Sequence, residues 1–156
     1  MRAMGLDVGT KTVGIAVSDE LGLTGQAVTT LRRTNVRADL DALAALVEEH
    51  EVGQLVVGLP MNMDGTEGPS AQLARALGDK LAERTSLPVA YWDERLTTRE
   101  AQRTLLEADV SRARRRKVID QVAATLILQG WLDARAHARG GADLDGPASE
   151  GDWSDS

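Results

Sequence analysis

The 156-residue sequence contains no cysteine and no phenylalanine, and aromatic residues make up only 3% of it. Without cysteine the chain can form neither disulfides nor thiolate metal sites, which fits a reducing compartment. No apolar run approaches the roughly 18 residues that a membrane span needs, and no signal peptide precedes the first predicted strand. We therefore expect a cytoplasmic protein whose core is built from Leu, Val, Ile and Ala.

An excess of positive charge is also absent, because the net charge is −6. The charge is unevenly distributed: residues 140–156 hold five acidic residues and no Lys or Arg, which leaves 18 basic and 19 acidic residues in 1–139. The segment 112–117 (RARRRK) places five positive charges in six positions. We predict one folded domain over 1–139 and an acidic, disordered tail over 140–156.

The hydrophobic period changes along the domain from that of strands to that of helices and back. Strands are predicted over 3–9, 12–18, 23–31, 54–60 and 88–92, and helices over 36–50, from Pro69, over 98–107 and over about 115–138. The order βββ-α-β-α-β-α-α predicts an α/β fold with a mixed five-stranded sheet, three antiparallel strands followed by parallel ones, and helices on both faces. This order matches the ribonuclease H-like architecture, which does not by itself name a function.

Three carboxylates occupy unusual positions in these elements. Asp7 interrupts an apolar strand, and an ionised carboxylate in a sheet is costly unless it is paired, hydrogen-bonded or bound to a metal. Glu94 follows the last strand, at the edge where parallel sheets bind ligands. Asp120 lies on a closely packed helix, next to the basic segment 112–117. Plainer alternatives exist: Asp7 could accept backbone hydrogen bonds in the following turn, and Asp120 could form a surface ion pair.

Three carboxylates, with no cysteine and only two histidines, favour a hard, oxygen-binding cation such as Mg²⁺ or Mn²⁺. Two such ions could clamp the attacking and leaving oxygens of a phosphodiester. The basic segment would bind flanking phosphates. Its cationic residues are Arg112, Arg114, Arg115, Arg116 and Lys117. Together these residues predict metal-dependent phosphodiester hydrolysis.

Four segments, GLDVGTKTVGIAVSD, VVGLPMNMDGTEGP, DERLTT and KVIDQVAATLIL, resemble in order the characteristic blocks of the YqgF/RuvX family. This bacterial group of ribonuclease H-like proteins is described as Holliday junction resolvases or as nucleases that mature the small-subunit ribosomal RNA precursor. The resemblance spans residues 3–135 and implies metal-binding catalytic roles for Asp7, Glu94 and Asp120. It also implies supporting positions near substrate at Lys11 and Asn62.

Other residues in or near these blocks have alternative roles. Better-studied resolvases of this architecture have an acid at the end of the fourth strand, where this chain has GLP, so Glu94 must reach into that space from the fifth strand. Asp64 could contribute instead, although a turn role in MDGT is favoured, and Asp93 points to the face opposite Glu94. Arg95 is a candidate for substrate binding, or pairs with a neighbouring acid.

The sequence therefore predicts a divalent-metal-dependent nuclease acting on structured nucleic acid, either in 5′-end processing of pre-16S rRNA or in the resolution of Holliday junctions. It does not choose between RNA and DNA, and symmetric cleavage of a junction would need a homodimer. One alternative is a non-catalytic module that keeps the fold and binds nucleic acid. Another is an actin-like or sugar-kinase-like protein, whose phosphate-binding hairpin LDVGTKTVGIA would suit, but those proteins duplicate the domain and this chain has one half.

Overall fold

The computed structural model describes residues 1–96 and 112–145, and within the last helix it describes the side chains of residues 122–138. In chain order the elements are β1 (Arg2–Val8), β2 (Thr12–Ser18), β3 (Gly25–Arg32), α1 (Val36–Glu49), β4 (Val52–Leu59), α2 (Pro69–Thr85), β5 (Val89–Asp93), the 3-10 helix η1 (Glu94–Leu96) and α4 (Arg112–Asp145). The strands lie within two residues of their predicted ranges, and α1 and α2 begin at the predicted residues. Among the described helices, none is long and apolar enough to cross a membrane.

The strands form one five-stranded sheet in the order β3-β2-β1-β4-β5. β1 pairs antiparallel with β2 and parallel with β4, β2 pairs antiparallel with β3, and β4 pairs parallel with β5. This is the predicted mixed sheet, with β1 at its centre. The carboxyl ends of β1, β4 and β5 consequently meet at one edge.

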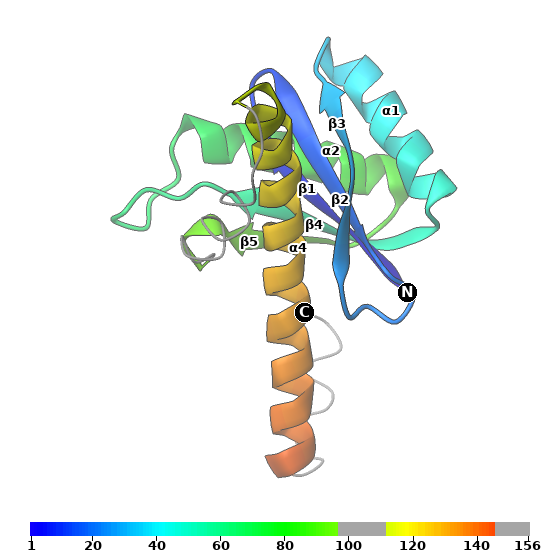
Figure 1. The fold of residues 1–156 in the computed structure, drawn as a ribbon, viewed down its shortest axis with the longest axis vertical. Helices are drawn as coiled ribbons and strands as arrows, with labels where there is room; N and C mark the ends of the chain where they lie inside the picture. The colour runs from blue at the N-terminus through cyan, green and yellow to red at the C-terminus, as the bar shows by residue number, and fades with distance from the viewer. Residues whose placement is uncertain (97–111, 146–156) are drawn as a thin grey trace.

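Helices cover both faces of the sheet, α1 and α2 on one side and α4 on the other (Figure 1). The alternation of β1 divides its side chains between the two cores. Leu6 and Val8 are buried with α1 and α2, whereas Ala3 packs in the α4 core. At Gly5 a Cβ atom would lie 2.7 Å from Leu128 Cβ, so the missing side chain allows α4 to pack directly on β1.

The ends of α4 differ from the prediction of about 115–138, because the helix runs from Arg112 to Asp145. Among the described side chains of α4, Leu132 is the last in the core, so no burial pattern beyond it marks where the helix ends. Beyond it the sequence is rich in Ala and Arg, which favour a helix without needing a packing partner. This part of α4 extends past the sheet (Figure 1). Residues 140–145 of the predicted tail are therefore helical, while the predicted helix over 98–107 lies outside the described residues.

Candidate active site

Asp7 lies next to last in β1, at the edge where the parallel strands end. It is paired with Gly14 across the antiparallel β1–β2 ladder and is half-buried. Since Leu6 and Val8 face the α1 and α2 core, Asp7 belongs to the face that α4 covers. The strict alternation of side chains along a strand accounts for this orientation.

Glu94 begins η1, directly after β5, and its side chain reaches back over the sheet. A Cβ atom at Gly58 in β4 would lie 3.2 Å from Glu94 Cγ. The pKa of Glu94 is raised to about 7. The largest cause is burial, and the negative charges of Asp7 and Asp93 add to it. Asp7, at the end of β1, and Glu94, after β5 two strands away, are thus close enough for the charge of Asp7 to oppose ionisation of Glu94.

Asp93, the residue before Glu94, forms several hydrogen bonds with Arg95. The guanidinium Nε and Nη2 donate to the Asp93 carboxylate at 2.6–3.1 Å, and the backbone N–H of Arg95 donates to Asp93 Oδ1 at 2.9 Å. These hydrogen bonds from Arg95 lower the pKa of Asp93. The two neighbouring acids therefore have pKa values shifted in opposite directions, that of Asp93 downward and that of Glu94 upward.

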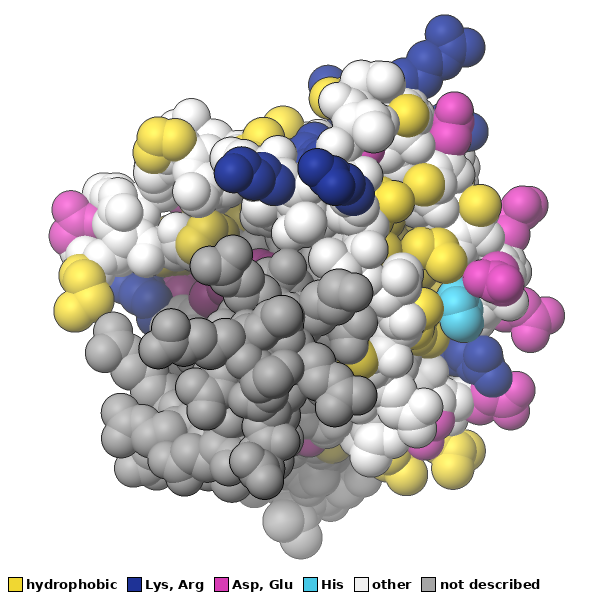
Figure 2. All heavy atoms as spheres, turned by 45° about the horizontal axis from the view of Figure 1, so that its top comes forward, with side chains coloured by type: hydrophobic (Ala, Val, Ile, Leu, Met, Phe, Trp, Pro, Cys, Tyr) yellow, Lys and Arg dark blue, Asp and Glu magenta, His cyan; other side chains and the backbone are white. Residues whose placement is uncertain are grey.

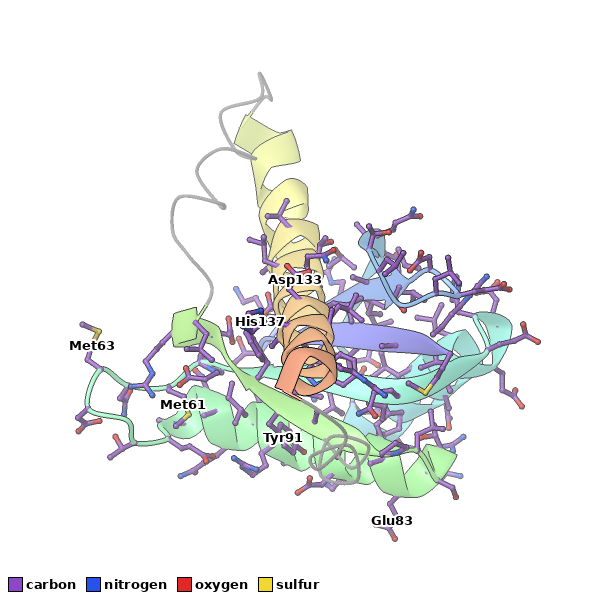
Figure 3. The ribbon with its side chains drawn as sticks, turned by 90° about the horizontal axis from the view of Figure 1, so that it is seen from below. Met61, Met63, Glu83, Tyr91, Asp133 and His137 are labelled. Atoms are coloured by element: carbon purple, nitrogen blue, oxygen red, sulfur yellow. The ribbon has the colours of Figure 1, made fainter. Side chains whose placement is uncertain are left out.

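Arg95 also contacts the loop that joins β4 to α2. Its Nη1 donates to the carbonyl oxygens of Asn62, at 3.3 Å, and Met63, at 3.4 Å. Met63 lies at the tip of this loop and points away from the body of the protein (Figure 3). Arg95 thus connects the segment carrying Glu94 to the loop after β4, and the substrate contact predicted for it stays a prediction.

The loop itself is organised by hydrogen bonds among its own residues. Asp64 Oδ1 accepts from the N–H and hydroxyl of Thr66, and Asn62 Nδ2 donates to Thr66 Oγ1 at 2.9 Å. Gly65 has a φ of 88°, which a residue with a side chain rarely adopts. The favoured turn role of Asp64 is confirmed. The side chain of Asn62 supports the same turn, and its role near substrate stays a prediction.

The turn after β1 is braced by an ion pair that the sequence analysis missed. Arg33 donates from Nη1 to the carbonyl oxygen of Gly9 at 3.1 Å and from Nε to Asp39 Oδ2 at 3.0 Å. Asp39 is buried and also accepts from the N–H of Thr34. The sequence signal was an acid in the first turn of α1, four residues after its N-cap Asn35. This bracing fixes the turn that presents the exposed Lys11.

Asp120 and the basic residues from Arg112 to Lys117 lie in α4, as predicted for Asp120, but their side chains are outside those described. Asp120 comes one helical turn before Ala124, whose carbonyl oxygen would be 2.9 Å from a Cβ atom at Gly5. The structure thus brings together Asp7 and Glu94 and leaves the third predicted acid untested. Among the described side chains there is no cluster of three acids or histidines that could hold a metal ion.

The chemistry of the pair fits a divalent cation. Both donors are carboxylates, the ligand type that Mg²⁺ and Mn²⁺ prefer. The raised pKa of Glu94 distinguishes this pair from ordinary surface acids. A cation between the two carboxylates would offset the repulsion that opposes ionisation of Glu94.

Comparisons with known proteins give one consistent result. A family model described as RuvX, Holliday junction resolvase, matches residues 1–134. A Myxococcus xanthus protein named "Putative pre-16S rRNA nuclease" is 66% identical over 134 residues, which are 86% of this chain and 89% of that protein. A Symbiobacterium thermophilum protein of the same name is 59% identical, over 87% of this chain and 94% of that protein.

Solved structures share the fold at low sequence identity. Thermus thermophilus RuvC in complex with a Holliday junction substrate matches with a TM-score of 0.57 and 13% identity, over 87% of this chain and 96% of that chain. The fowlpox virus resolvase in complex with Holliday junction DNA matches with a TM-score of 0.55 and 9% identity, over 86% of this chain and 98% of that one. The predicted fold is confirmed by these likenesses and by the sheet topology.

Proposed function

The chain belongs to the RuvX family, and on this premise we propose that it is a divalent-metal-dependent nuclease that hydrolyses phosphodiester bonds in structured nucleic acid. The observation that carries the proposal is the Asp7–Glu94 pair at the carboxyl ends of the parallel strands. Ligands bind at this edge in open sheets of this kind, and the raised pKa of Glu94 marks a site that gains from a positive charge.

Asp120 is proposed as the third carboxylate because of the course of α4. Leu132 lies near Gly22, beside the start of β1, and Ala124 lies at Gly5, further along that strand. One more turn toward the start of α4 leads to Asp120, in the direction that follows β1 from Gly5 to Asp7. The spacing of one turn, about 5.4 Å, is close to the two-residue advance of a strand, about 6.6 Å.

The residues of the chain have separate roles in the proposed reaction. Asp7, Glu94 and Asp120 would hold Mg²⁺ or Mn²⁺, as two ions in the fullest form of the proposal. Such ions supply Lewis acidity and lower the pKa of water, which serves attack on phosphorus. Lys11, at the tip of the braced turn, would offset negative charge that develops on the phosphate. Asp93 and Arg95 would keep Glu94 in place through the hydrogen bonds described above.

Two substrates are proposed, and both would be met in the cytoplasm. One is the 5′ end of pre-16S rRNA, after the names of the relatives, and the other is a Holliday junction, after the family description. Paired, symmetric cleavage of a junction would require two sites and hence a homodimer. Trimming of an RNA end needs one site.

The test incubates the protein with Mg²⁺ or Mn²⁺ and with either a labelled four-way DNA junction or precursor rRNA carrying an unprocessed 5′ end. Linear duplex and the Asp7→Asn variant serve as controls. We expect cleavage of one of the two structured substrates, and loss of at least 100-fold in rate on Asp7→Asn with its circular dichroism unchanged. Full activity in folded Asp7→Asn would overturn the catalytic assignment. Junction binding without metal and without cleavage would favour the non-catalytic module.

A further inference from the structure

Several of the described arginines pair with described acids. Five form ion pairs, namely Arg2 with Glu20, Arg33 with Asp39, Arg75 with Glu67, Arg84 with Asp41 and Arg95 with Asp93. Arg32 is exposed, and within residues 1–96 and the described side chains of α4 no carboxylate pairs with it or with Lys11. These two positive charges therefore remain available to a ligand.

Register places Arg32 on the same face of the sheet as Asp7. In the β2–β3 ladder Arg32 is opposite Thr12 and Leu31 is opposite Val13. Val13 is buried in the α1 and α2 core and Leu31 packs against it, so Arg32 belongs to the opposite face, which α4 covers. Asp7 belongs to that face too, two strands away in β1. Two strand spacings are roughly 10 Å.

Lys11 lies between them along this edge. It precedes Thr12, the register partner of Arg32, and its carbonyl oxygen accepts the N–H of Arg33 at 2.8 Å. The turn and the end of β3 are thus fastened together, so the backbone positions of Lys11 and Arg32 are fixed relative to Asp7. Figure 2, which brings this end of the molecule forward, shows Lys and Arg side chains gathered on its surface.

We infer that Arg32, together with Lys11, binds backbone phosphates of the nucleic acid on the β3 side of the cleavage site. The inference deepens the proposed function and rests on it. A guanidinium matches a phosphate with two parallel hydrogen bonds, and unpaired cations in a row are the electrostatic footprint of a polyanion. Lys11 and Arg32 lie on the side of Asp7 that leads across β2 to the edge strand β3. They would therefore bind the substrate strand next to the scissile phosphate rather than that phosphate itself.

A different role for Arg32 is protection of the edge strand, because charged residues on an edge strand discourage pairing with a second sheet. That role predicts that neutral variants self-associate and that nucleic-acid binding is unchanged. The phosphate role predicts a smaller salt dependence of binding with no change in association state. The two can therefore be separated in one set of measurements.

The experiment measures binding of the labelled four-way junction and of precursor rRNA, without divalent metal, between 50 and 200 mM salt. Arg32→Gln is compared with wild type and with Arg84→Gln, a charge-matched control at the end of α2. For Arg32→Gln we expect binding about fivefold to tenfold weaker at low salt, and a slope of log K against log salt that is smaller by about one. Arg32→Lys should keep most of the slope. Combining Arg32→Gln with Lys11→Gln should lower the slope by about two.

The outcomes distinguish this inference from the proposed function. If wild type cleaves but Arg32→Gln binds with unchanged affinity and slope, the phosphate role of Arg32 is overturned and the nuclease assignment stands. An equal loss in Arg84→Gln would overturn it too, because the effect would then be one of net charge. If wild type neither binds nor cleaves either probe, the proposed function itself fails. Sedimentation of Arg32→Gln as an aggregate with unchanged binding would assign the residue to edge protection.

Discussion

At the scale of single residues, the proposed metal-binding pair of Asp7 and Glu94 lowers the stability of the fold when both acids are ionised. Glu94 has a pKa of about 7 in the folded protein against its usual 4.5, because it is partly buried and faces Asp7. Between these values the folded state binds more protons than the unfolded state. The free energy of unfolding must therefore fall as pH rises from about 4.5 to about 7, and the full cost is present above pH 7.

Replacing Glu94 by Gln should remove that cost, because Gln mimics the protonated acid. We expect the variant to match wild type below pH 4.5 and to exceed it by about 2 kcal/mol above pH 7, a value reduced for partial exposure. Urea unfolding with chelator, at a series of pH values, measures the difference. Glu83→Gln, an exposed change at the far end of α2 (Figure 3), is the control and should show no such slope. A pH-independent difference for Glu94→Gln would contradict the raised pKa of Glu94.

Arg95 links two segments at the same edge, and its loss should affect turnover more than stability. The ion pair with Asp93 is solvent-exposed, so it contributes little to the free energy of unfolding. We expect Arg95→Ala to lower kcat about tenfold, since the loop after β4 and Glu94 are no longer held together. Arg95→Lys should not restore the rate, because an ammonium cannot make the paired hydrogen bonds.

The readout for Arg95 separates positioning from substrate contact. Hydrogen exchange of residues 61–66 should become faster in Arg95→Ala if Arg95 positions the loop. A variant with unchanged loop exchange and a reduced salt dependence of substrate binding would show that Arg95 contacts the nucleic acid instead.

At the scale of elements, the contact of α4 with β1 depends on the absence of a side chain at Gly5. A Cβ atom there would lie 2.7 Å from Leu128 Cβ and 2.9 Å from the carbonyl oxygen of Ala124. Both are rigid parts of the helix, so Gly5→Ala should push α4 away from the sheet and cost about 1–3 kcal/mol of stability.

Thermal unfolding and activity together test this contact. Gly25→Ala is the matched control, because the nearest atom to its Cβ is the flexible Leu128 Cδ2 at 3.1 Å. We expect Gly5→Ala to lower both the Tm and the rate of cleavage, since α4 also carries Asp120, and Gly25→Ala to lower them less. Equal effects in the two variants would mean that α4 adapts to either.

The elements themselves were largely predictable from the sequence, and the reasons are local. Alternation placed Leu6 and Asp7 on opposite faces, and the proline at position 69 marked the start of α2. The contacts of Arg95 with residues 62 and 63 were not predictable, because they join segments 32 residues or more apart. The placement of Glu94 over the sheet likewise depends on a distant glycine, Gly58, whose missing side chain leaves room for Glu94 Cγ.

At the scale of the whole molecule, a divalent ion should stabilise the fold in proportion to its occupancy. Binding at 100 times the dissociation constant adds about 2.7 kcal/mol, and for a domain of this size that raises the Tm by about 5–10 °C. The gain should be larger at pH 8 than at pH 5, where Glu94 holds its proton. Differential scanning calorimetry with Mg²⁺ or Mn²⁺ measures it. Asp7→Asn should abolish most of the gain, and an undiminished gain would place the ion elsewhere.

The packing of α4 also determines when the fold can be completed during synthesis. Ala3, Ala16 and Val56 on the sheet face are buried by residues from 124 onward, and Gln129 binds backbone groups of Leu23 and Gly25 more than 100 positions earlier. A nascent chain can pair its first strands early, but that face stays open until α4 has left the ribosome. The complete fold therefore has to wait for α4, and a chain that stops before α4 leaves this apolar sheet face exposed.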